Sequence, residues 1–135
     1  MNIEITGDIL ELIGVGYLLI LFMGGNFGWL RSNSRLAVHF VIACAFFVLG
    51  VKYYGLNLSS FGNENGAGFL FGPIIFVVLY ASLRAFYKKI FSFEPDMVAY
   101  SGYSTRDQRR LNFLDYVVFL VPTVLSILIS LLLAN

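Results

Sequence analysis

Four long stretches without a charged residue constrain this chain more than any other feature. The first and last of them, 12–30 and 116–134, are each 19 residues long, which matches the ~20 residues that an α-helix needs to cross ~30 Å of hydrocarbon. The two between them, 36–51 and 67–83, are shorter, but flanking Lys and Tyr residues extend them into the membrane interface. We therefore expect an all-α fold, an integral membrane bundle of four transmembrane helices.

The composition agrees with this expectation. Of the 135 residues, 59% are apolar and 13% are charged, whereas a soluble domain carries about 25% charged residues. We expect one membrane domain over 1–135, with no metal ion or cofactor. The predicted spans are about 12–30, 36–54, 67–87 and 113–134, with a cytoplasmic loop at 88–112.

Two prolines and one capping pair predict where the helices bend and where the last helix begins. Pro73 and Pro122 lie inside predicted spans, where a proline removes a backbone hydrogen bond and predicts a kink. Thr105 and Gln108 have the spacing of a capping box, which predicts that the last helix begins near Arg106.

The orientation follows from the basic residues in the short connecting loops, because cytoplasmic loops carry an excess of Lys and Arg. With both termini outside the cytoplasm, only Lys52 of the nine basic residues falls outside. The other eight fall on the cytoplasmic side: Arg31, Arg35, Arg84, Lys88, Lys89, Arg106, Arg109 and Arg110. An even number of spans places both termini on the same side, and the charge bias places that side outside. The two signals therefore agree on four spans with both termini outside the cytoplasm.

The densest charged feature is the basic set at the predicted cytoplasmic loop. It is a candidate contact for anionic lipid headgroups or for an acidic partner surface, and consists of Arg84, Lys88, Lys89, Arg106, Arg109 and Arg110. The alternative is that these residues only determine topology and are solvated or paired with nearby acids. We also expect Asp115 to pair with Arg84 or Lys88 at the mouth of the last span.

Small residues mark candidate packing faces, since they let membrane helices approach closely. Gly24 with Gly28, and Gly68 with Gly72, are pairs at four-residue spacing, and a small polar face on the last span comprises Thr123, Ser126 and Ser130.

Glu11, at the edge of the first span, is the candidate transport carboxylate. It stands in Ile9-Leu10-Glu11-Leu12-Ile13-Gly14, which over this short string is similar to the first helix of small multidrug-resistance transporters. That resemblance implies a glutamate that exchanges protons with a cationic substrate. The alternative is that Glu11 belongs with other acids near a helix N-terminus, where the helix dipole favours negative charge.

Other chemistry is disfavoured. The chain has one cysteine, Cys44, and one histidine, His39, and no ligand spacing that predicts a metal site. No nucleophile with a base and no phosphate-binding glycine loop is present, so we do not expect an enzyme. A net charge of +1 does not favour nucleic-acid binding.

Two functions remain open. The first is a small accessory, regulatory or immunity-type subunit that contacts a membrane protein partner through its helices. The alternative is a small oligomeric transporter or lipid-flipping component. Both place the chain in a cell membrane, as a multi-pass protein of a bacterial inner membrane surrounded by the lipid bilayer.

Overall fold

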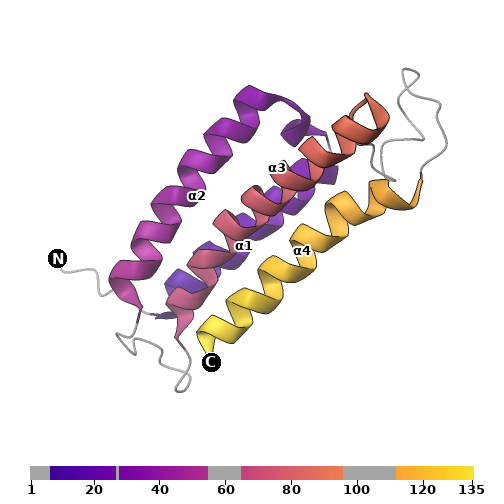
Figure 1. The fold of residues 1–135 in the computed structure, drawn as a ribbon. Helices are drawn as coiled ribbons and strands as arrows, with labels where there is room; N and C mark the ends of the chain where they lie inside the picture. The colour runs from indigo at the N-terminus through magenta and orange to yellow at the C-terminus, as the bar shows by residue number, and fades with distance from the viewer. Residues whose placement is uncertain (1–6, 27, 55–64, 96–111) are drawn as a thin grey trace.

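The computed structural model describes residues 7–26, 28–54, 65–95 and 112–135 of the chain. In these ranges it contains the elements α1 (Gly7–Asn26), η1 (Trp29–Arg31), α2 (Asn33–Tyr53), η2 (Gly66–Phe71), α3 (Gly72–Phe91) and α4 (Phe113–Ala134). Four helical regions are long and apolar enough to cross a membrane. The prediction of an all-helical protein with four such helices is confirmed (Figure 1).

The four helices alternate in direction along the bundle (Figure 1). Gly66 lies against the backbone of Gly7, and the N–H of Asn65 donates to the carbonyl oxygen of Ala134 at 2.6 Å. The beginning of α1 and the end of α4 therefore lie at one end of the bundle, which we call the termini end. The opposite end carries Arg31, Arg84 and Asp115, and we call it the charged end.

Helix α3 contacts the other three helices and supplies much of the core. Its buried residues recur every three or four positions and form one continuous stripe, which comprises Gly72, Pro73, Phe76, Val77, Tyr80, Arg84 and Tyr87. Leucines of α1 and Val118 and Phe119 of α4 pack on this stripe. In contrast, α2 buries only Ala43 and Gly50, so it lies at the edge of the bundle.

The third helical region begins differently from the prediction. A short 3-10 helix, η2, precedes α3, and its residues from Gly66 to Leu70 are buried. Pro73 lies in the first turn of α3, where the N–H groups have no partner within the helix. The predicted kink at Pro73 is therefore wrong, because the proline costs the helix no hydrogen bond there. Pro122 does lie inside α4.

Helix α4 begins at Phe113, not near Arg106. Asn112 is the N-cap, with extended backbone, and its side chain accepts a hydrogen bond from the Asp115 N–H while the Asp115 carboxylate accepts one from the Asn112 N–H. This reciprocal arrangement is a capping box that satisfies two of the unpaired donors of the first turn. The predicted capping pair, Thr105 and Gln108, lies outside the described residues.

Candidate functional site

Arg84 is a buried side chain with four hydrogen bonds at the charged end. Its Nε donates to Oε2 of Glu94 and its Nη2 donates to Oε1 of the same carboxylate, each at 2.7 Å. The guanidinium group is thus held by both carboxylate oxygens, the geometry in which Arg and carboxylate interact most strongly. Arg84 is only 5% exposed, so its charge depends on this pairing.

The same guanidinium group also reaches the connection between α1 and α2. Nη1 donates to Oδ1 of Asn33 at 2.9 Å, and Nη2 donates to the backbone carbonyl of Arg31. Four hydrogen bonds from one side chain therefore join α3 to the beginning of α2 and to the segment that follows α3. The guanidinium group is thus buried and bonded within the protein, and the contact of Arg84 with a lipid or partner stays a prediction.

The chain returns to Arg84 through a left-handed turn at the end of α3. Ser92 has a φ of 61°, and its N–H donates to the carbonyl oxygen of Lys88 at 2.9 Å. A non-glycine residue in this conformation is uncommon. The turn brings Glu94 back under α3, where Oε1 also accepts a hydrogen bond from Nζ of Lys88 at 2.8 Å.

Two opposing effects set the pKa of Glu94. Burial raises the pKa of this carboxyl, but the hydrogen bonds from Arg84 and Lys88 outweigh burial, so the pKa lies below its ordinary value of 4.5. A lowered pKa means that the ionised form is the one stabilised by folding. Glu94 is therefore a carboxylate partner of the two cations.

The remaining predicted contact residues divide into two groups. Lys88 and Lys89 are exposed on the last turns of α3, although Lys88 already pairs with Glu94. Arg106, Arg109 and Arg110 lie outside the described residues. Within the described part of the basic set, only the two lysines thus present charge at the surface.

Among the described residues, Asp115 forms no ion pair with Arg84 or Lys88, the partners expected of it. The side chain is 1% exposed and serves the α4 capping box, while Arg84 and Lys88 both pair with Glu94. Asn112, the other member of the capping box, donates from Nδ2 to the hydroxyl oxygen of Tyr87 at 3.1 Å. Asp115 thereby fixes the beginning of α4, which is also linked to α3.

Of the two predicted glycine pairs, one lies on a packed surface and the other does not. At Gly68 a Cβ would come within 2.6 Å of the backbone N of Ala134, and at Gly72 within 2.5 Å of Oγ of Ser130. This pair lies on the packed surface between η2, α3 and α4. Gly28 instead has a φ of 70° in the turn after α1, so Gly24 and Gly28 do not form one helix face, because α1 ends at Asn26.

The small polar face of α4 is directed into the protein. Ser126 and Ser130 are fully buried, and the Ser126 hydroxyl donates to the carbonyl oxygen of Thr123 at 2.9 Å. Thr123 in turn donates to the carbonyl oxygen of Phe119 at 2.8 Å. Oγ of Ser130 has no hydrogen-bond partner among the described residues. Ser130 lies against the first residue of α3, because a Cβ on Gly72 would meet its Oγ.

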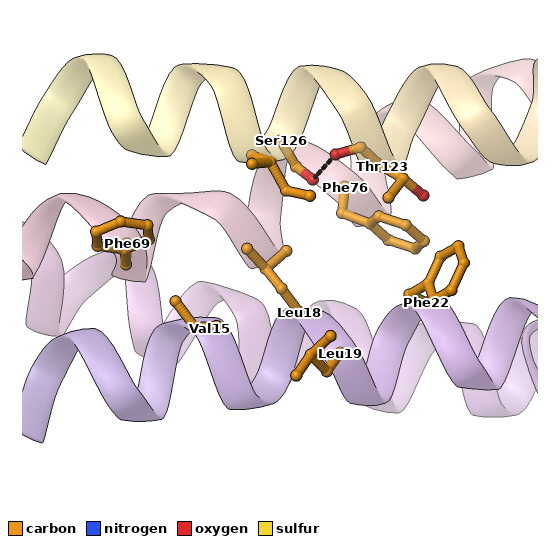
Figure 2. A pocket seen from close by; sticks show the side chains of 9 residues that line it. Val15, Leu18, Leu19, Phe22, Phe69, Phe76, Thr123 and Ser126 are labelled. Carbon is orange, nitrogen blue, oxygen red and sulfur yellow. Dashed lines mark hydrogen bonds between the residues drawn. The ribbon is translucent and has the colours of Figure 1, made fainter.

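A cavity of about 340 Å³ lies between α1 and α4, next to this polar face. Figure 2 shows four α1 side chains on one wall and Thr123 and Ser126 opposite them. The complete lining is Val15, Leu18, Leu19, Phe22, Phe69, Phe76, Thr123, Ser126 and Ile127. The cavity is almost entirely apolar, and sequence patterns alone gave no indication of it because it depends on how the helices diverge.

Glu11 is partly exposed and lies one helical turn before Val15 on α1. Its position continues the face that lines the cavity toward the termini end. His39 contacts the first helix instead, through a 2.7 Å hydrogen bond between its Nδ1 and the hydroxyl of Tyr17. The described residues contain no group of three His, Cys, Asp or Glu side chains placed to hold a metal ion.

Comparison of the chain with known proteins identifies no family. No protein-family model matches it, and no curated protein or solved structure does either.

Proposed function

We propose that this protein is inserted in a cell membrane, a bacterial inner membrane, with its charged end in the cytoplasm and both termini outside. Arg31, Arg35, Lys88 and Lys89 lie at or near the charged end, and Lys52 near the opposite end of α2. Such an excess of basic residues on one side supports this orientation under the positive-inside rule. The large apolar side chains exposed along the four helices support insertion.

Within the membrane, we propose that it acts by helix-to-helix contact as an accessory, regulatory or immunity-type subunit. The observation that supports this function is the position of α2, a 21-residue helix in which only the small residues Ala43 and Gly50 are buried. The face of α2 that points away from the bundle is apolar and is not covered by the protein itself, with Val41 and Val48 exposed by 68% and 65%. A partner helix would dock on this surface.

Photocrosslinking tests this function. A photoreactive phenylalanine analogue is placed at Val41 or Val48 on α2, and at Leu120 or Leu132 on α4 as a matched pair of exposed apolar control positions. We expect irradiated membranes to yield one adduct of defined mass with a different membrane protein from the α2 positions only. Absence of any protein adduct from α2, or equal adducts from α4, would contradict a partner surface on α2.

A second candidate function, a small oligomeric transporter or lipid-flipping component, is favoured by one feature. Glu11 lies one turn beyond the α1–α4 cavity, on the same face of α1 as Val15. In that function Glu11 would exchange protons at the mouth of the route. Replacement E11Q should then abolish cation efflux or lipid flipping by reconstituted protein, and an unchanged rate would remove this candidate.

A further inference from the structure

The α1–α4 cavity lies halfway along the helices that form it. Thr123 is ten residues after the first residue of α4 and eleven before the last, which places it about 15 Å from either end at 1.5 Å per residue. Val15 and Leu18 occupy the middle of α1. In a spanning bundle, this depth is that of the lipid acyl chains, not of the headgroups.

The cavity wall offers almost nothing to a polar ligand. Its only two hydroxyls belong to Thr123 and Ser126. The Thr123 hydroxyl donates its hydrogen to the backbone carbonyl oxygen of Phe119, and the Ser126 hydroxyl donates to that of Thr123 (Figure 2). A buried water makes about three hydrogen bonds, but this wall offers it only two hydroxyl oxygens as acceptors and no donor. Water and charged ligands are therefore poor occupants.

The cavity also opens on the apolar surface of the protein. Leu19 and Ile127, on opposite walls, are 58% and 43% exposed, whereas Phe76 deeper inside is 2% exposed. A hydrocarbon chain outside the mouth thus has a continuous apolar path to Phe76. An empty cavity would leave its lining without dispersion contacts on one side, and an entering chain restores them.

We infer that the cavity binds one acyl chain of a bilayer phospholipid. The volume fits this ligand, because an apolar cavity of ~150 Å³ takes one benzene, and about 340 Å³ holds, in proportion, a chain segment of roughly a dozen carbons. The inference rests on the membrane insertion proposed above and is independent of any protein partner. The α1–α4 cavity is then a lipid-binding site.

The test uses the full chain in phosphatidylcholine vesicles that contain a phospholipid with a diazirine in the middle of one acyl chain. After irradiation, adducts are mapped by mass spectrometry. We expect adducts on Leu18 or Phe76, inside the cavity, and on the exposed α2 residues Val41 and Val48. Adducts on α2 alone would overturn the lipid site while leaving membrane insertion intact, and a lack of adducts on both would overturn insertion itself.

One substitution at the mouth of the cavity and one beside it provide a matched comparison. I127W enlarges a lining residue and should reduce the Phe76 adducts several-fold, whereas L128W enlarges the neighbouring exposed residue, which is not part of the lining, and should leave them unchanged. Equal adduct yields in the two variants would contradict entry by this route.

A third variant, T123V, tests the chemistry of the ligand without changing the shape of the wall. Because the Thr123 hydroxyl hydrogen is already donated to Phe119, removing the hydroxyl should leave the adducts on Phe76 unchanged. Their loss in T123V would show that the ligand bonds to this hydroxyl and would overturn an acyl chain as the occupant.

Discussion

The arginine at position 84 shows how one residue can determine the structure of a bundle end. A buried guanidinium group is stable only when its donors are satisfied. Here Glu94, Asn33 and the Arg31 carbonyl satisfy four of its five donors. Arg84 therefore fixes the positions of three chain segments relative to one another.

Replacing Glu94 by glutamine removes the charge that Arg84 requires and keeps the size of the side chain. We expect E94Q to lower the free energy of unfolding by about 1.5–3 kcal/mol, the range for hydrogen bonds to charged groups, as measured by thermal unfolding in detergent. K88Q is the control, because the Lys88 side chain is 46% exposed and an exposed pair contributes about 0–1 kcal/mol. An equal effect of the two substitutions would contradict the role assigned to Glu94.

The Glu94 pair also predicts a dependence of stability on pH. The pKa of Glu94 is lower in the folded protein than its ordinary value of 4.5, so its stabilising contribution is complete above that value and is lost as the pH falls through the lowered pKa. Between about pH 6 and about pH 3, the Tm of the wild type should therefore decrease more than the Tm of E94Q. Parallel curves for the two proteins would exclude Glu94 as the group responsible.

At the scale of elements, η2 explains why several glycines stand where they do. Backbone atoms of η2 approach α1 and α4 so closely that a Cβ on Gly14 would lie 2.7 Å from the Phe69 carbonyl carbon, and one on Gly68 would lie 2.6 Å from the Ala134 nitrogen. Membrane helices associate through such close packing, because lipid is as apolar as their side chains. The termini end is thus closed by backbone contact.

Substituting alanine for each of two glycines separates the effect of this close packing on stability from the effect of helix propensity. G68A should destabilise the protein by about 1–3 kcal/mol, because α4 must move to accept the methyl group. G16A is the matched control, since no atom lies within 4 Å of a Cβ at that position, and it should leave stability unchanged or raise it by up to about 1 kcal/mol. Thermal unfolding of both variants provides the measurement, and a neutral G68A would argue against the tight η2 contact.

The sequence predicted the helices better than their contacts. Long uncharged stretches indicate spanning helices directly, because their length is set by the bilayer. Asp115 was expected to pair with Arg84 or Lys88, but both cations pair with Glu94. Glu94 reaches them through the left-handed turn at Ser92, which the sequence does not indicate because a non-glycine residue rarely adopts this conformation. The cavity could not be predicted either, because it arises from the separation of α1 and α4.

At the scale of the whole molecule, charge is confined to the ends of the bundle. Apart from Arg84, the buried residues of α3 are apolar or aromatic, and Arg84 itself lies at the charged end. A bundle with its charged groups at the two ends is compatible with a bilayer, because an ionisable group at the bilayer centre is strongly disfavoured. The positive-inside rule predicts that the charged end faces the cytoplasm.

Cysteine accessibility in intact cells measures that orientation directly. In a C44A background, single cysteines are introduced at the termini end (Y54C, N135C) and at the charged end (S34C, K89C), all at exposed positions. A membrane-impermeant maleimide should label the first pair in intact cells and the second pair only after permeabilisation. Labelling of S34C and K89C in intact cells, with protection of Y54C and N135C, would contradict a four-span bundle with its termini outside.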